Sequence, residues 1–386
     1  MIAYNPTWLA NTRLQKVLKD DLRNGYISDD EFKAIAAKYP VGFYTPGAGA
    51  RIGLFILTCV VISFGDGLIA LMTASSNWIL SAGFPIFLGI ISYVGLELMV
   101  NVNKHYRSGV DDALLFICLG QFLIAFFVLF SGVNGNPNYI VFTGIGCVLS
   151  LVLTIHFADM MTSAVCAAFF FALVYFLWTR IIPAGAATVP FIIMVVSAGA
   201  YWLTYTKRAA FINYEDCFLI GQLVCLLVLY AAGNYFIVQS LSEELSGQTG
   251  HPLPFGAFFW AWTVGLPFVY VGFGIKKKDT ILLRTGLLLV AAAVITFRTY
   301  YHILPLDVAL TIVGAALLGI AYSIMRYLKT PKHGFTYAEP DEENTTDHLK
   351  IESLIIAETF SATAPAASPD RFGGGDFGGG GSSDSF

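Results

Sequence analysis

The densest group of side chains able to bind a ligand or transfer a proton lies near the end of the apolar part of the chain. Arg298, Tyr300, Tyr301, His302 and Asp307 fall within ten residues. A guanidinium and an imidazole can hold an anionic ligand, with tyrosine hydroxyls as further donors. At a membrane boundary, the same residue types also form an aromatic belt with an arginine that reaches toward the headgroups. The group is a candidate ligand site with a structural alternative.

Asp66 is the candidate for proton or cation chemistry. It lies mid-way along a long apolar run, between Gly65 and Gly67. An ionised carboxylate inside hydrocarbon is costly unless it is paired, hydrated or protonated. A proton or cation site is therefore one interpretation of Asp66, and a structural hydrogen-bonding role is the other.

Two amide side chains, Gln121 and Gln222, lie within other apolar runs. They are candidates for lining an ion or solute path. The alternative is that they hydrogen-bond across helices and hold the bundle together.

The sequence contains no motif for an enzyme, a metal site or a cofactor. A P-loop, HExxH, GxSxG and a His-rich metal motif are all missing. The spacing from Asp20 to Glu31 partly matches a calcium-binding EF-hand loop, but Leu22 stands where an oxygen ligand is needed. A helical turn without metal explains these residues, and we expect a non-enzymatic protein without cofactor or metal.

Composition shows which elements must position these residues. The 386 residues are 56% hydrophobic and 12% charged, whereas soluble domains average about 25% charged. Such a chain has more apolar surface than one soluble core can bury, which indicates contact with lipid. The net charge of -4 gives no basic footprint for nucleic acid.

The apolar runs predict an all-α polytopic membrane bundle. A spanning helix needs about 20 apolar residues to cross about 30 Å of hydrocarbon. The runs are continuous rather than alternating, which favours helices over a barrel. Ten spans are predicted at about 52–73, 79–100, 112–131, 138–157, 161–178, 186–205, 215–238, 254–275, 280–297 and 305–328.

The bundle, residues 51–329, is flanked by two polar ends. Residues 1–50 predict a small helical hairpin with a linker, in which Gly25 ends the first helix and Ser28 and Glu31 form a capping box that opens the second. Residues 330–386 are acidic and then Gly-rich, so we expect a disordered tail.

Two parallel four-helix repeats, 111–208 and 214–329, are suggested by recurring residues. Each begins with paired acids that are followed by a Gly-Gln pair, and each has an acid at the start of a later span and an arginine at that span's far end. These residues are Asp111-Asp112, Gly120-Gln121, Asp159 and Arg180 in the first repeat, and Glu215-Asp216, Gly221-Gln222, Asp279 and Arg298 in the second.

The chain also resembles two bacterial membrane families, domain of unknown function 2157 and, toward the C-terminus, domain of unknown function 4401. The first resemblance rests on Asn24-Gly25-Tyr26-Ile27-Ser28, Arg51, Asn77-Trp78 and Gly120-Gln121, and the second on Lys278-Asp279, Arg298, Tyr300-Tyr301-His302 and Leu306-Asp307. Asp66 departs from the first pattern, where an apolar or small residue is expected. Neither family has an established activity, so the resemblance implies architecture and a bacterial inner membrane.

Two function classes remain open. One is a transporter-like protein that handles a small solute or ion through the candidate residues. The other is a non-catalytic sensor, scaffold or assembly factor that recruits a protein partner through its hairpin or its Gly/Phe tail. In both, the lipid bilayer is the main partner.

The distribution of basic residues predicts that both termini are cytoplasmic. With the N-terminus inside, the only Lys or Arg residues in the predicted external loops are Arg180 and Arg298. The cytoplasmic segments between and after the spans hold Lys104, Arg107, Lys207, Arg208, Lys276, Lys277, Lys278, Arg326, Lys329 and Lys332. We expect alkaline phosphatase fused after Lys332 to be inactive, because that enzyme folds only outside the cytoplasm. An active fusion would reverse the topology.

Overall fold

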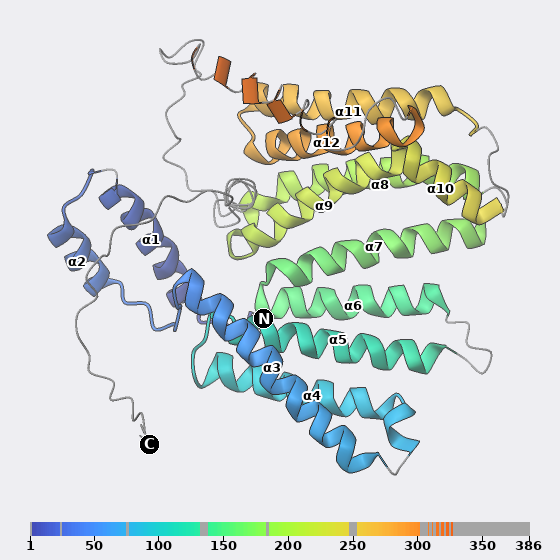
Figure 1. Ribbon diagram of the computed structural model, residues 1–386. Helices are drawn as coiled ribbons and strands as arrows, with labels where there is room; N and C mark the ends of the chain where they lie inside the picture. The colour runs from blue at the N-terminus through green and yellow to red at the C-terminus, as the bar shows by residue number, and fades with distance from the viewer. Residues whose placement is uncertain are drawn as a thin grey trace, which may run out of the picture. The chain divides into compact units, whose positions relative to one another are not determined.

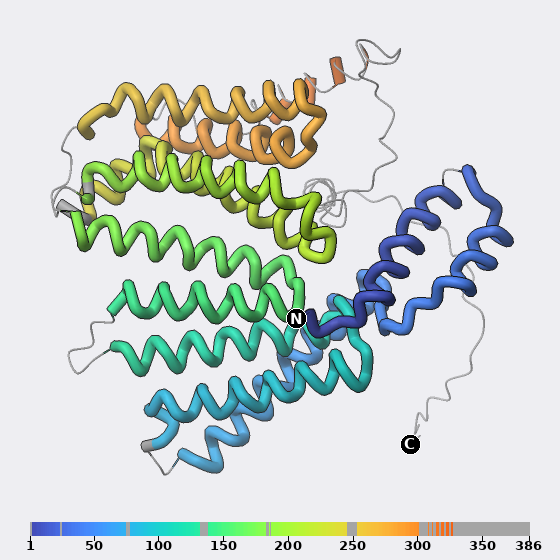
Figure 2. Tube along the Cα trace, turned by 180° about the vertical axis from the view of Figure 1, so that it is seen from behind, coloured from blue at the N-terminus to red at the C-terminus, as the bar shows by residue number. Residues whose placement is uncertain are grey.

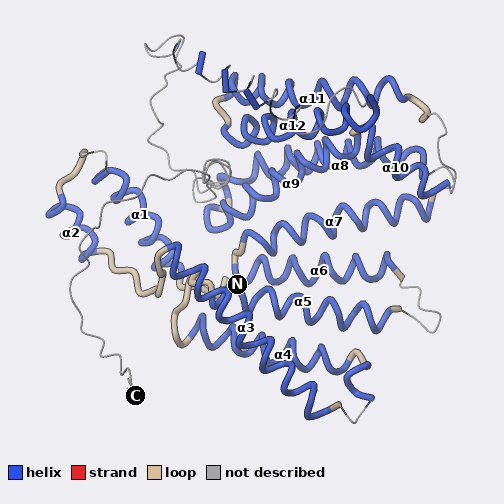
Figure 3. Tube along the Cα trace, viewed as in Figure 1, coloured by secondary structure: helices blue, strands red, loops and turns tan. Residues whose placement is uncertain are grey.

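The computed structural model describes residues 2–23, 25–74, 77–131, 138–182, 185–246 and 253–301, with scattered positions between 308 and 326. Its named elements are helices (Figure 3), and one isolated backbone bridge joins Tyr44 to His105. The predicted all-α architecture is confirmed. The predicted tail, 330–386, and most of the predicted tenth span, 305–328, lie outside the described residues.

Nine helices in the described part of the chain are long and apolar enough to cross a membrane. Each has at least 19 residues, which at about 1.5 Å rise per residue covers nearly the whole hydrocarbon thickness. They are α3 (Ala48–Thr73), α4 (Gly83–Asn101), α5 (Val110–Phe130), α6 (Tyr139–Phe157), α7 (Met160–Ile181), α8 (Gly185–Lys207), α9 (Glu215–Gly233), α11 (Gly256–Lys277) and α12 (Thr280–Tyr301).

Helices that follow one another in the chain pack in pairs, α4 with α5, α6 with α7, α8 with α9 and α11 with α12. The series runs from α3 and α4 to α11 and α12 (Figure 1), and the same order is visible from behind (Figure 2). The turns 102–109, 158–159, 208–214 and 278–279 lie at one end of these helices, which we call the charged end.

Two of the turns at the charged end share the same local geometry. Ala158 and Lys278 both adopt left-handed backbone conformations, with φ of 48° and 54°. Each is followed by an aspartate whose carboxylate caps the next helix. Asp159 Oδ2 accepts from the Thr162 amide at 2.8 Å, and Asp279 Oδ1 accepts from the Ile281 amide at 3.0 Å. The match falls where the suggested repeat places equivalent acids, and the repeat itself stays a prediction.

The predicted span 215–238 is wrong at its far end, because the helix breaks at Asn234. Asn234 has an extended backbone, with φ -69° and ψ 124°. Its Oδ1 accepts from the Ile237 amide at 3.2 Å, and its Nδ2 donates to Thr296 Oγ1 at 3.0 Å. These bonds favour a new helix start over continuation. A short helix, α10 (Tyr235–Ser246), therefore occupies part of the predicted loop.

The predicted N-terminal hairpin is confirmed as α1 (Pro6–Arg23) and α2 (Asp29–Lys38). Gly25 takes φ +76° after α1, and Ser28 and Glu31 form the expected capping box. The Ser28 amide and hydroxyl both donate to the Glu31 carboxylate, which lowers the pKa of that group. No residue of α2 is buried.

The N-terminal residues fasten the hairpin to the charged end. Tyr4 and Leu9 are buried in a cluster with Leu96 and Phe157, and the Ala3 amide donates to the backbone oxygen of His156 at 2.7 Å. The hairpin is thus anchored by its first turn, while its second helix faces outward.

Glycine-to-alanine substitutions near the contact between α11 and α12 test how tightly these spans pack. A Cβ at Gly274 would lie 2.7 Å from the Leu283 amide nitrogen, whereas a Cβ at Gly272 would meet nothing within 4 Å. We expect Gly274→Ala to lower the free energy of unfolding by about 1–3 kcal/mol through overpacking. The matched Gly272→Ala should leave it unchanged or slightly higher. Thermal unfolding in detergent measures both, and equal effects would contradict the packing.

Candidate functional site

Two of the predicted site residues form a direct pair between neighbouring helices. Gln121 Nε2 on α5 donates to Asp66 Oδ2 on α3 at 3.0 Å. Gln121 lies about 14 Å of helix rise beyond Asp112 at the start of α5, close to the middle of a core about 30 Å thick. Asp66 is only partly buried, and α3 contributes no fully buried residue. The carboxylate is therefore held by one amide at the edge of the described helices.

The other predicted residues do not join this pair. Gln222 lies on α9, with α6 and α7 between α9 and α5 (Figure 1). Tyr300 packs against the rings of Tyr235 and Trp260, with centroids 5.0 and 5.7 Å away, as an aromatic belt would. Arg298 and Tyr301 belong to the last turn of α12, and His302 and Asp307 lie outside the described residues.

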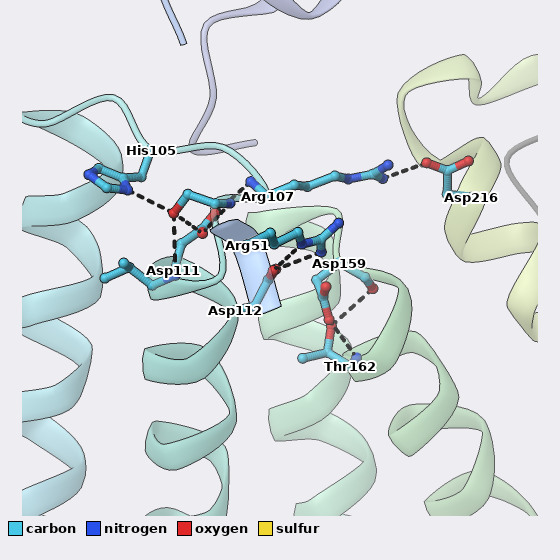
Figure 4. Close-up of polar contacts among 10 residues, drawn as sticks. Arg51, His105, Arg107, Asp111, Asp112, Asp159, Thr162 and Asp216 are labelled. Atoms are coloured by element: carbon cyan, nitrogen blue, oxygen red, sulfur yellow. Dashed lines mark hydrogen bonds and ion pairs between the residues drawn. The ribbon is translucent and has the colours of Figure 1, made fainter. Parts of the chain in front are cut away.

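A group of charged residues joined by ion pairs and hydrogen bonds, which we call the charged-end network, consists of Arg51, Arg107, Asp111, Asp112 and Asp216 (Figure 4). Arg51, in the first turn of α3, donates to Asp112 Oδ2 through Nε at 2.9 Å and Nη2 at 2.7 Å. This forked contact joins α3 to α5.

Arg107 extends the network to α9. Its guanidinium pairs with Asp216 in the first turn of that helix. Burial lowers the pKa of Arg107, but the charges of Tyr106 and Asp216 outweigh it and raise that pKa above its ordinary value. The two residues are more than a hundred positions apart in the chain. Arg107 lies just before the first suggested repeat, and Asp216 lies near the start of the second.

Asp111 holds the turn that presents Arg107. Its carboxylate accepts from the backbone amides of Arg107 and Ser108, each at 2.8 Å. Ser108 Oγ in turn lies 2.7 Å from His105 Nδ1. Asp111 is 3% exposed, and the two amides that it accepts from belong to the turn just before α5. The aspartate thus fixes the position from which Arg107 reaches α9.

A small recess lies under the N-terminal segment, lined by Tyr4, Tyr106, Arg107, Asp111, Asp112 and Asp159 among others. The space inside is about that of one water molecule. Burial, reinforced by the charge of Asp111, raises the pKa of Tyr4 well above its ordinary value. The recess contains none of the predicted site residues, and Tyr4 closes it. It is a packed joint rather than a solute site.

A second polar contact near the charged end joins α4 to α6. His156 lies in the last turn of α6, and its Nε2 pairs with Glu97 Oε1 on α4, at 2.9 Å. Glu97 also accepts from the Tyr93 hydroxyl at 2.8 Å. Asp159 caps α7.

The charged-end network was missed as a unit by sequence reasoning. Its acids were visible at the beginnings of spans, Arg107 was counted only for topology, and Arg51 was named only for the family resemblance. A signal did exist, because an acid beside each basic turn is a candidate ion pair. Which arginine meets which acid depends on how α3, α5 and α9 pack.

The Arg107–Asp216 pair should stabilise the fold more than an exposed pair does. The two side chains are 26% and 19% exposed, whereas those of Lys33 and Asp29 on α2 are 67% and 63% exposed. We expect Arg107→Ala or Asp216→Ala to cost about 1–3 kcal/mol, because each removes the ion-pair partner of a partly buried charge. Lys33→Ala should cost about 0.5 kcal/mol or less.

A double-mutant cycle on unfolding in detergent measures this coupling. The double variant Arg107→Ala/Asp216→Ala should lose less than the sum of the single variants. Strictly additive losses would mean that the pair does not couple α5 to α9.

Comparison with models of protein families, with curated proteins and with solved structures returned no match for this chain. The resemblance to domains of unknown function 2157 and 4401 therefore stays an expectation. What the structure supports directly is a multi-pass membrane protein with many apolar helices.

Proposed function

We propose that the protein handles protons in the membrane, with Asp66 as the group that binds the proton and Gln121 as its hydrogen-bonding partner. The observation that carries the proposal is the 3.0 Å bond from Gln121 Nε2 to Asp66 Oδ2 between two membrane-spanning helices. In this proposal the protein is transporter-like, and it carries an ion rather than an organic solute.

The depth of the pair favours a proton. Placing an ionised aspartate at the centre of a spanning helix costs about 2.5–3.5 kcal/mol on insertion scales, and the protonated acid avoids this charge. One amide bond compensates only part of that cost. Binding a proton removes the charge and with it the rest of that cost.

The donor set argues against a metal cation. Calcium takes six to eight oxygen ligands, and magnesium needs an octahedral oxygen shell. At Asp66 the described partner is an amide nitrogen, which is a donor rather than a ligand. A single carboxylate with one donor suits a proton better.

The surroundings of Asp66 on α3 are loosely packed. Gly65 and Gly67 flank it, and a Cβ at either position would meet nothing within 4 Å. The α3 helix carries exposed apolar side chains along its length, including Phe64 and Leu68 at 72% and 61% exposure. Movement of α3 against α5 would therefore displace few packed side chains.

The scaffold or sensor function is the second candidate, and a separate observation favours it. The hairpin is fixed to the bundle by its first turn, and Lys104 lies 4.8 Å from the Trp8 ring centroid. Its second helix has no buried residue and can meet a partner. Under this interpretation the spans are an anchor, and no ion crosses.

Proton flux separates the two candidates. The purified chain is reconstituted into liposomes that contain a pH-sensitive dye, and a potassium gradient with valinomycin drives the flux. We expect wild-type liposomes to change internal pH faster than protein-free ones, and Asp66→Asn to return the rate to the protein-free level. Asp66→Glu should retain part of the flux, because it keeps the acid.

The control for this assay is Thr58→Val on the same helix. The Thr58 hydroxyl donates to the Leu54 carbonyl at 2.8 Å and does not titrate, so the flux should stay at the wild-type rate. Wild-type flux no faster than that of empty liposomes would reject the proton proposal and leave the scaffold function.

A further inference from the structure

The seam between α9 and α12 contains two polar groups that the proposed proton site does not use. Gln222 is 1% exposed and Thr285 is 2% exposed. Gln222 Nε2 and Thr285 Oγ1 have no hydrogen-bond partner among the described residues. Leaving a buried donor unsatisfied is costly, and native structures contain few such groups.

The two side chains belong to facing stripes of their helices. Leu219 and Leu226 lie three residues before and four residues after Gln222, on the same face of α9. Leu282 and Leu289 flank Thr285 in the same way on α12. These four leucines share one buried cluster, so the polar groups lie within the contact between the helices.

A hydrogen bond farther along the same contact shows how α9 and α12 are aligned along their lengths. Asn234 Nδ2 donates to Thr296 Oγ1 at 3.0 Å. Counting back along parallel helices, Gln222 lies about 18 Å below Asn234, and Thr285 about 17 Å below Thr296. Gln222 and Thr285 therefore lie nearly opposite each other.

Thr285 also behaves unlike the other threonines of these spans. A threonine inside a helix usually donates its hydroxyl to a carbonyl one turn earlier. The Thr285 hydroxyl makes no such bond. Threonines that do donate to the carbonyl four residues earlier are Thr58, Thr73, Thr143, Thr154, Thr179, Thr204, Thr206, Thr263, Thr296 and Thr299.

We propose that Gln222 and Thr285 form a buried hydration site that holds one water molecule between α9 and α12. The amide nitrogen requires an acceptor, and the hydroxyl can donate or accept. A water molecule supplies both functions without charge. A bare anion would lose its hydration in an apolar cluster, and a metal cation would find a donor nitrogen instead of a ligand oxygen.

The proposed site would be a second layer of polar side chains in the contact between α9 and α12. Tyr230, Asn234 and Thr296 form the first level, toward the far end of α9. Between the two levels the contact is apolar, through Leu226 and Leu289. The bridging water would thus tie α9 to α12 on the charged-end side of this apolar layer.

The test is a double-mutant cycle on the full chain in detergent, with thermal unfolding as the readout. Gln222→Leu and Thr285→Val should each lower the melting temperature, by about 2–4 °C. The double variant should lose little more than either single variant, because one water serves both side chains. Thr285→Ser keeps the hydroxyl and should retain most of the stability.

Thr299→Val is the matched control on α12. Thr299 is exposed and donates to the Ile295 carbonyl at 3.0 Å, so its replacement should shift the melting temperature by less than either seam variant. If Gln222→Leu does not fold, the Thr285 variants and a high-resolution density map of the wild type still decide the question.

In that map, we expect a density peak within about 3.2 Å of both Gln222 Nε2 and Thr285 Oγ1. Two results would overturn the proposal. One is an unchanged or higher melting temperature in both single variants, as expected for polar groups that bind nothing. The other is density with the amide and the hydroxyl in direct contact.

Discussion

The constraint on which the rest of this structure depends is that hydrocarbon offers no hydrogen bonds. Backbone groups meet it by forming long helices, many threonines meet it by donating to a carbonyl of their own helix, and some polar side chains meet it by bonding to a neighbouring helix. Gln121 with Asp66, and Asn234 with Thr296, are two such solutions. Each joins helices that are far apart in the sequence, so the requirement for a partner also determines which spans lie together.

Charged side chains are concentrated at the charged end, where their ion pairs hold the helices together. Arg51 ties α3 to α5 through Asp112, and Arg107 ties the turn before α5 to α9 through Asp216. Asp111 holds that turn through backbone amides. The N-terminal hairpin uses the same end, because Tyr4 completes the buried cluster there. A movement of the hairpin would therefore disturb the links between spans, which is the structural basis for considering it a sensor.

The proposed proton site and the proposed hydration site occupy different seams. Asp66 lies where α3 is loosely packed on α5, and Gln222 lies in a tight contact between α9 and α12. A loosely held carboxylate can change its charge and its contacts, whereas a buried amide in a leucine-lined seam is suited to a fixed water. The same chemistry of buried polar groups therefore supports a dynamic role at one seam and a structural role at the other.

The sequence by itself determined the helical membrane architecture, because runs of about 20 apolar residues have no other stable form in a bilayer. It also determined the capped hairpin and singled out Asp66. Only the tertiary structure decided that Gln121 bonds to Asp66, that Gln222 lies elsewhere, and that Asn234 breaks a predicted span. The reason is physical. Hydrophobic length depends on consecutive residues, whereas the partner of a polar group depends on which helices pack together and in what register.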